Sequence, residues 1–391
     1  MGLAAGHRLR AGLEGALILA VGMGFGRFAY TAVYPYMVSE GVLTVEGGSL
    51  AASANYAGYL LGALLSVRMR PEAAHRFALV ALAGTSVCLL LMAPLTSAAV
   101  IILLRGLAGA FSAVAFVAAS VWLMKRRGQS HRAPLLYAGV GTGIAASAEF
   151  VVLAEGLGLT SAGMWVLLGV ATAVIGLAVA PGLLGTRTVA AQVASAARNA
   201  ATPVATAPLT VIYGLAGFGY IITATYLPLL VASALPDLNA AHAWAVFGLG
   251  AAPSCFFWHW VHARLGTPRA LALNLVVQAA GVALPTVSQS AAGYLTSALL
   301  VGATFMGTVT IVMPAAQRVA TGTNLVAVLT FVYGIGQIVG PLLAGALYAR
   351  SQSFAGSLLV AAAALGVGAA ATVLLHRGRL TSGGRGHRPT P

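Results

Sequence analysis

The sequence predicts an all-α membrane protein with twelve transmembrane helices in two six-helix halves and both termini in the cytoplasm. Three observations lead to this fold class. The 391 residues are 59% hydrophobic and only 7% charged, which leaves too few polar side chains to cover a soluble globule. Apolar stretches of span length follow one another along the chain, and motifs of its first half recur in the second.

Each predicted span is an apolar stretch of about 20 residues, because a helix rises about 1.5 Å per residue across about 30 Å of hydrocarbon. Residues 1–184 are expected to form the first six-helix half and residues 206–376 the second. The alanine-rich residues 185–205 are expected as a cytoplasmic linker, and residues 377–391 as a disordered cytoplasmic tail. In chain order, the spans are expected at 13–37, 47–67, 76–95, 97–123, 134–157, 163–184, 206–231, 240–262, 269–289, 293–316, 325–348 and 354–376.

Basic residues gather in alternate connections between these spans, which sets the expected orientation. The opposite loops hold one basic residue, Arg350, together with Glu40, Glu46 and Asp237. This asymmetry is the positive-inside pattern, so the net charge of +14 needs no nucleic-acid partner. The sequence thus indicates a multi-pass protein of a bacterial-type inner (plasma) membrane. The expected cytoplasmic set is Arg8, Arg10, Arg68, Arg70, Arg76, Lys125, Arg126, Arg127, Arg132, Arg187, Arg198, Arg264, Arg269, Arg318, Arg377, Arg379, Arg385 and Arg388.

Few residues suit metal, cofactor or enzyme chemistry. Cys88 and Cys255 fall inside spans, where a small apolar packing residue is the ordinary use. His259 and His262 flank tryptophans at a membrane edge, which favours interfacial anchoring over metal binding. No nucleotide loop of the Gly-x-x-x-x-Gly-Lys type occurs. The sequence therefore predicts neither a metal nor a cofactor, and no enzyme activity.

The two halves share motifs at nearly constant spacing. "GFGRFAYTAVYPYM" at 24–37 returns as "GFGYIITATYLPLL" at 217–230, with a proline nine residues after the second glycine in each copy. Such a parallel repeat places a substrate site between the halves, near the bilayer midplane. Two further pairs follow in the same order: "LLRGLAG" (103–109) with "LLVGATFMG" (299–307), and "YAGVGTG" (137–143) with "YGIGQIVG" (333–340).

These motifs also carry a family resemblance over essentially the whole chain. With "SANYAGYLLGAL" (53–64), "YAGVGTGIAAS" (137–147) and "YGIGQIVGPLLAG" (333–345), the sequence resembles the major facilitator superfamily and, within it, the YbfB/YjiJ-type transporters. The resemblance implies the major facilitator fold. One position departs from the superfamily pattern, since Ser66 stands where many members carry an acid after the second span.

Four polar side chains of the first half are expected to converge beyond the midplane. Arg27 lies about 21 Å above the cytoplasmic start of span one, and Glu149 about 22 Å into span five. Arg105 and Asn55 each lie about 12 Å from the opposite surface. A charge in lipid costs at least ~2.5–3.5 kcal/mol, so each should face a cavity or a partner. An Arg27–Glu149 pair that only fixes helix packing is one interpretation. A positive site for an anionic solute, with Glu149 carrying a coupling proton, is the other.

Tyrosines and one amide extend this candidate site. Tyr30 and Tyr34 lie at i+3 and i+7 from Arg27, on one helical face. Tyr220 and Tyr226 offer a similar uncharged face in span seven, and Gln337 a polar group in span eleven. Packing tyrosines with hydroxyls bonded to the backbone are the simpler alternative.

Together these features predict a secondary active transporter that moves a small anionic or amphiphilic organic solute by alternating access, with proton-coupled export. Export is favoured because "RGLAG" at Arg105 matches an Arg-x-x-x-Gly pattern of many proton-linked exporters in the superfamily that the chain resembles. Proton-driven or facilitated uptake of a small carboxylate is the alternative. A non-transporting membrane receptor or lipid-handling protein on the same scaffold is a second. The expected partners are the solute, protons and the lipid bilayer, and we expect a monomer.

Overall fold

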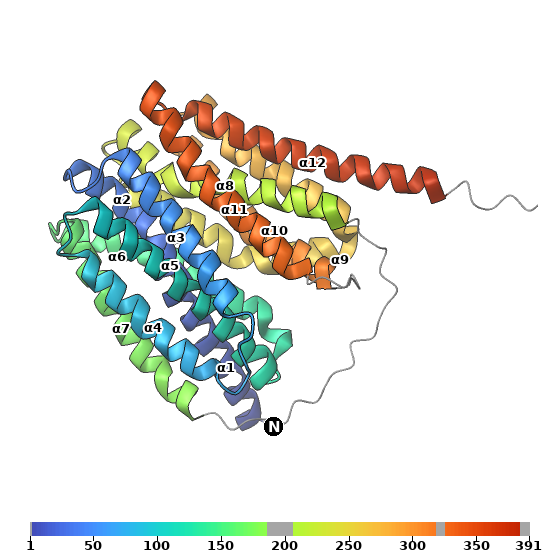
Figure 1. Cartoon of the computed structure of the whole chain (residues 1–391), viewed down its shortest axis with the longest axis horizontal. Helices are drawn as coiled ribbons and strands as arrows, with labels where there is room; N and C mark the ends of the chain where they lie inside the picture. The colour runs from blue at the N-terminus through green and yellow to red at the C-terminus, as the bar shows by residue number, and fades with distance from the viewer. Residues whose placement is uncertain (1, 186–205, 318–324, 384–391) are drawn as a thin grey trace, which may run out of the picture.

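The computed structural model describes residues 2–185, 206–317 and 325–383, and every regular element within them is helical (Figure 1). The first of these stretches contains α1 (Gly2–Leu19), the π-helix η1 (Ala20–Phe28), α2 (Ala29–Ser39), α3 (Val45–Leu65), α4 (Ala74–Met92), α5 (Ala98–Val121), the π-helix η2 (Trp122–Arg126), the 3-10 helix η3 (Ser130–Arg132), α6 (Ala133–Gly156) and α7 (Ser161–Leu184). The other two contain α8 (Thr206–Ala234), α9 (Ala240–Val287), α10 (Ala291–Gln317), α11 (Leu325–Ser351) and α12 (Ala355–Gly383).

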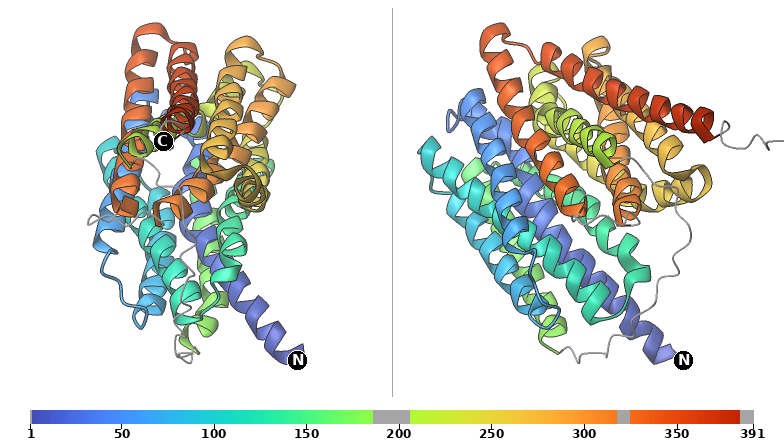
Figure 2. Two further views of the ribbon diagram at one scale, coloured as in Figure 1. Left: turned by 90° about the vertical axis from the view of Figure 1, so that its right-hand side faces the viewer. Right: turned by 45° about the vertical axis from the view of Figure 1, so that its right-hand side comes forward.

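The helices form two groups in space (Figures 1 and 2). We call α1–α7 with η1–η3 the N-terminal bundle, and α8–α12 the C-terminal bundle. Between the bundles, α3 packs against α11 and α6 packs against α9. Figure 2 shows the bundles adjoining where α2 leads into α3, while the start of α1 and the end of α12 lie far apart.

Ten helices in the described part of the chain are long and apolar enough to cross a membrane. One of them, α9, has 48 residues and is interrupted at Gly266, whose φ of 72° lies in the left-handed region. The predicted spans 240–262 and 269–289 fall on either side of this break. The predicted second span, 47–67, corresponds to α3, which is not among the ten. Serine, asparagine and tyrosine side chains make α3 less apolar, and several of them bond to the C-terminal bundle.

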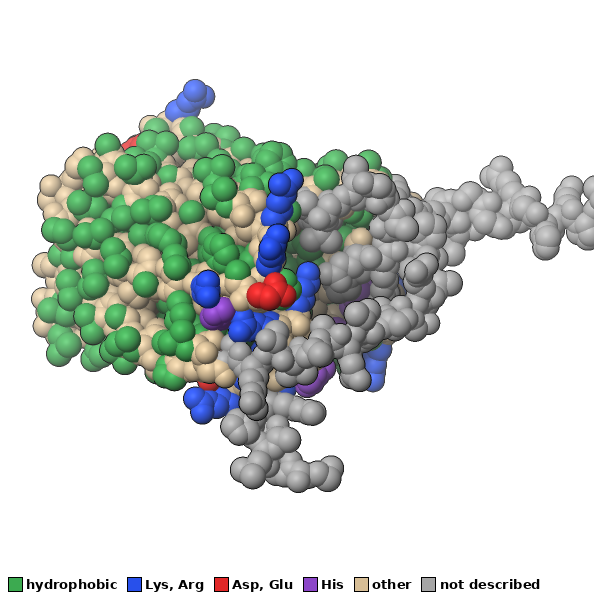
Figure 3. Space-filling model, turned by 60° about the horizontal axis from the view of Figure 1, so that its bottom comes forward, with side chains coloured by type: hydrophobic (Ala, Val, Ile, Leu, Met, Phe, Trp, Pro, Cys, Tyr) green, Lys and Arg blue, Asp and Glu red, His purple; other side chains and the backbone are tan. Residues whose placement is uncertain are grey.

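The outer surface is largely apolar, as a membrane-embedded fold requires. Leu65, Leu103 and Leu177 expose 84%, 75% and 74% of their surface. In Figure 3, hydrophobic side chains are spread over the left-hand part of the face, whereas most of the Lys and Arg side chains gather in the lower middle of the view. This segregation agrees with the charge pattern along the sequence.

The first helix is not a uniform α-helix, which the sequence analysis did not predict. Nine residues, Ala20–Phe28, form the π-helix η1, and all of them are buried. Its glycines allow close approach to neighbouring helices: a Cβ on Gly24 would lie 2.3 Å from the backbone carbonyl carbon of Gly143 in α6. The π-helix ends at Phe28, so it carries Arg27 in its last turn.

The ends of the chain differ in part from the sequence expectation. Helix α1 already begins at Gly2, well before the predicted start at residue 13. Helix α12 continues to Gly383, so residues 377–383 of the predicted disordered tail are helical. Residues 384–391 of that tail, and residues 186–205 of the predicted linker, lie outside the described residues.

Candidate functional site

Arg27 lies at the interface of the two bundles and is 4% exposed. Its Nη2 donates a hydrogen bond to Oε1 of Gln337 in α11, at 2.9 Å. The Nε2 of Gln337 donates in turn to the hydroxyl of Tyr220 in α8. Arg27, in the last turn of η1, is thereby connected to two helices of the C-terminal bundle. Tyr220 occupies the position that corresponds to Arg27 in the sequence repeat, so the equivalent residues of the two halves meet through one amide.

Aromatic rings surround the Arg27 guanidinium. Its Cζ lies 4.1 Å from the ring centroid of Tyr59, 4.8 Å from that of Tyr56 and 5.2 Å from that of Phe28. Cation–π attraction of this kind partly offsets the cost of burying the charge. The rings lie against the guanidinium, whereas its N–H donors point outward in its plane.

A second aromatic layer supports the C-terminal side of this site. Tyr220 stacks on Phe305 at 4.7 Å between centroids and on Tyr333 at 5.9 Å. Tyr333 stacks further on Tyr213 at 4.5 Å. These contacts hold the hydroxyl of Tyr220 toward Gln337.

No carboxylate of the described chain neutralises Arg27. The ion pairs among the described residues join Arg10 to Glu14 and His242 to Glu149. The Nε of Arg27 is buried and has no hydrogen-bond partner. A buried guanidinium with an unused donor and no acidic partner is suited to bind an anion, and its planar geometry fits a carboxylate.

Arg105 bonds to the backbone next to Arg27. Its Nη1 and Nη2 donate to the carbonyl oxygens of Gly26 and Arg27, at 3.1 and 2.8 Å, and its guanidinium lies over the ring of Tyr30. It therefore supports the backbone at the end of η1, where the wider π-helix turn changes the hydrogen-bond register. Asn55 donates to the carbonyl oxygen of Arg105 at 2.8 Å and ties α3 to α5. Both residues position Arg27 rather than contact its guanidinium.

Three of the expected tyrosines bond to the backbone. The hydroxyls of Tyr30 and Tyr34 donate to the carbonyl oxygens of Gly48 and Val45, at 3.1 and 2.8 Å. The Tyr226 hydroxyl meets Oγ of Ser49 at 2.6 Å and the carbonyl oxygen of Pro341 at 3.0 Å. These contacts match the packing alternative, and Tyr226 also links the bundles.

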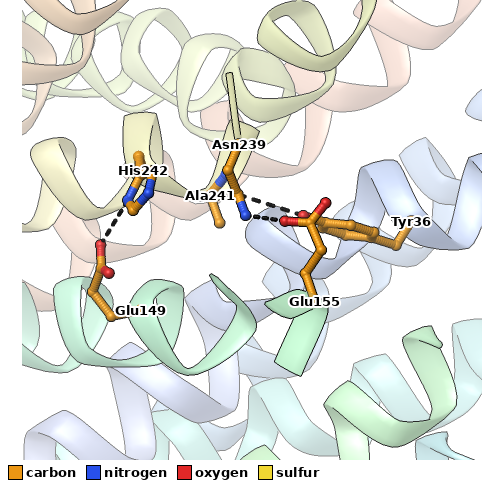
Figure 4. Close-up of polar contacts among 6 residues, drawn as sticks. All are labelled: Tyr36, Glu149, Glu155, Asn239, Ala241 and His242. Carbon is orange, nitrogen blue, oxygen red and sulfur yellow. Dashed lines mark hydrogen bonds and ion pairs between the residues drawn. The ribbon is translucent and has the colours of Figure 1, made fainter. Parts of the chain in front are cut away.

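Glu149 does not approach Arg27, and so the structure does not contain the Arg27–Glu149 pair that the sequence analysis considered. Its side chain is half exposed and contacts Nδ1 of His242 in α9 at 3.1 Å (Figure 4). Depth along α6 does not determine the direction of a side chain around the helix, and Glu149 faces α9. The contact nevertheless joins the two bundles through two titratable groups.

A second polar contact between the bundles lies beside this pair. Asn239, which precedes α9, donates to Glu155 at the end of α6 and accepts from the hydroxyl of Tyr36 at 3.4 Å (Figure 4). Other hydrogen bonds cross nearer to Arg27. They are Thr31 to Ala224, Ser53 to Ile338, Tyr56 to Thr225 and Trp244 to Phe28.

Tyr56, Tyr59 and His242 are not among the residues predicted from the sequence. Both tyrosines occur in "SANYAGYLLGAL", and Tyr59 lies at i+4 from Asn55, so helical spacing was an available signal for Tyr59. His242 lies near the start of a predicted span, and its pairing with Glu149 follows only from the packing of α6 on α9.

Comparisons with known proteins agree with this architecture. A family model described as "Uncharacterised MFS-type transporter YbfB" matches residues 19–373. No curated protein matches the sequence. A crystal structure of a mutant of the nucleoside transporter NupG superposes with a TM-score of 0.69 at 14% identity, covering 93% of this chain and 99% of that one. A bacterial homologue of the human lysosomal transporter Spinster, inward-facing and unoccupied, superposes with a TM-score of 0.70 at 13% identity, covering 98% and 99%. At these identities the structural likeness establishes the fold.

Proposed function

The chain belongs to the YbfB family of MFS-type transporters. From this premise we propose that it moves a small organic anion across the inner membrane by alternating access. The family and the structural neighbours are transporters, not enzymes. The choice of an anion as substrate depends on one observation. Arg27 is a buried charge between the bundles and has no acidic partner among the described residues.

A carboxylate bound at Arg27 would gain charge-assisted hydrogen bonds in a site from which water is excluded. The aromatic rings of Tyr56, Tyr59 and Phe28 would contact the apolar part of an amphiphilic anion. Tyr220 and Gln337 place polar groups of the opposite bundle beside Arg27. Arg105, Asn55, Tyr30, Tyr34 and Tyr226 hold the surrounding helices in place.

For the whole molecule, we propose twelve spans in two six-helix halves, 1–184 and 206–376, with both termini cytoplasmic. The count takes α3 as one span and α9 as two spans separated at Gly266. In this topology the cross-bundle bonds of Figure 4 lie at the periplasmic end, which corresponds to a carrier sealed on that side. Alternating access would break these bonds and close the opposite end.

We assign proton coupling to Glu149 together with His242. The pair is half exposed and joins α6 to α9, so its protonation state affects a contact that must open during transport. Protonating Glu149 removes its charge and weakens the bond to His242, whereas protonating only His242 strengthens it. Coupling of this kind fits proton-linked export, and the same pair would serve proton-driven uptake if the gradient acted in the opposite direction.

Flux into proteoliposomes tests the proposal. A panel of radiolabelled monocarboxylates and lipophilic cations is offered with an imposed pH gradient of either sign. We expect wild-type flux of at least one carboxylate and its loss in Arg27→Ala, while the exposed-residue control Arg68→Ala retains it. A preference for cations that persists in Arg27→Ala would contradict the anion site.

A further inference from the structure

Gln337 occupies one of the N–H donors of Arg27 that an anion would use. Its Oε1 accepts from Nη2 of Arg27 at 2.9 Å, and both side chains are more than nine-tenths buried. An amide oxygen and a carboxylate oxygen are alternative acceptors for the same terminal nitrogen. Nη2 carries two N–H groups, and a carboxylate that takes the one bonded to Gln337 must displace the amide.

The bond also joins the two bodies that have to move in transport. Arg27 belongs to η1 of the N-terminal bundle, whereas Gln337 and its partner Tyr220 belong to α11 and α8 of the C-terminal bundle. An unpaired guanidinium that stays away from water costs free energy. This cost raises the barrier for the unloaded carrier to change between its two states. Gln337 provides a neutral partner for the charge within the protein itself.

We propose that Gln337 is an internal competitor for the anion at Arg27, and that its bond across the bundles lets the unloaded carrier change state. This inference rests on the proposed function, since it assumes that Arg27 binds the solute. It predicts net transport, in which the carrier returns unloaded, rather than obligatory exchange of one anion for another. A neutral amide suits this role, because a carboxylate forms stronger, charge-assisted bonds and displaces it.

The direction in which anion affinity changes when Gln337 is removed distinguishes competition from direct contact with the solute. If Gln337 competes, its removal strengthens anion binding. If Gln337 only contacts the solute, its removal weakens binding. Gln337→Met keeps the side-chain length without the acceptor, and Gln337→Glu puts a permanent carboxylate beside Arg27. Gln278→Ala is a matched control, because Gln278 is a glutamine of the C-terminal bundle that is equally buried, in α9.

The experiment measures the Kd of a radiolabelled monocarboxylate on purified full-length protein, and net efflux and exchange of the same probe in proteoliposomes. For Gln337→Met we expect a Kd lower by about 2- to 10-fold and a ratio of net efflux to exchange lower by about tenfold or more. Gln337→Glu should lose binding and both transport modes, and Gln278→Ala should match wild type.

A weaker affinity in Gln337→Met, or equal losses of net efflux and exchange, would overturn the role of Gln337 while leaving the anion site in place. If Gln337→Met does not give folded protein, Tyr220→Phe serves instead, because it removes the other partner of the amide and should shift Kd and the flux ratio in the same directions. Wild-type protein that neither binds nor exchanges any carboxylate would overturn the proposed function, and this inference with it.

Discussion

At the scale of single residues, the site depends on two arginines, Arg27 and Arg105, which bond to different groups. Both arginines keep a buried Nε without a partner, and Arg27 shares Nη2 with a neutral amide. Arg105 gives both terminal nitrogens to carbonyl oxygens of η1, one of them the carbonyl oxygen of Arg27 itself. The terminal nitrogens of Arg105 are thus committed to the backbone that presents Arg27, whereas Arg27 bonds to a side chain that can be displaced.

Replacing Arg105 by alanine should lower stability and anion affinity together. The change leaves the buried carbonyl oxygens of Gly26 and Arg27 without these donors, at a cost of about 3 kcal/mol in unfolding free energy. Thermal unfolding in detergent and Kd measurements check this, and Arg105→Lys should recover part of both losses. An Arg105→Ala protein with wild-type melting but no anion binding would instead indicate direct contact with the solute.

Replacing Glu149 by glutamine should uncouple transport from the pH gradient without abolishing exchange. Glutamine keeps the size of the side chain but carries no titrating charge opposite His242. Exchange of the transported anion at symmetric pH should persist, while accumulation driven by a pH gradient should disappear. Accumulation that survives in both Glu149→Gln and His242→Gln would exclude this pair as the coupling site.

At the scale of elements, η1 depends on glycine. A methyl group on Gly24 would overlap the backbone of Gly143, which cannot move away as a side chain can. Gly24→Ala should therefore separate η1 from α6 and reduce both the yield of folded protein and transport. The matched control is Gly366→Ala in α12, where an added Cβ meets nothing within 4 Å and alanine should stabilise the helix by about 0.5–1 kcal/mol. Equal behaviour of the two variants, by thermal unfolding and flux, would contradict the close packing.

The sequence allowed most helices to be predicted, because span length and apolar content are local properties. The break in α9 was also predictable, since Gly266 lies in a basic connection between two apolar stretches. The π-helix η1 was not predictable from the sequence, because its register depends on Arg105 and on close packing against α6. Likewise, counting residues gave depths for Arg27 and Glu149 but not the helical faces that turn one toward α11 and the other toward α9.

At the scale of the whole molecule, transport by alternating access depends on which connections face the cytoplasm. With Cys88 and Cys255 replaced by alanine, a single cysteine at the exposed Ser39 should react with a membrane-impermeant maleimide on intact cells. A single cysteine at the exposed Lys125 should react only after the membrane is permeabilised. Labelling of Lys125→Cys on intact cells would contradict the cytoplasmic placement of the basic connections.

The proposed function depends on Arg27 binding the carboxylate of the transported solute. The most direct measurement is the Kd of the transported carboxylate for purified wild-type, Arg27→Lys and Arg27→Ala proteins of matched thermal stability. We expect Arg27→Ala to lose about 2–5 kcal/mol of binding free energy, and Arg27→Lys, which keeps the charge but not the planar donors, to lose less. Equal affinity in all three proteins would contradict this role of Arg27.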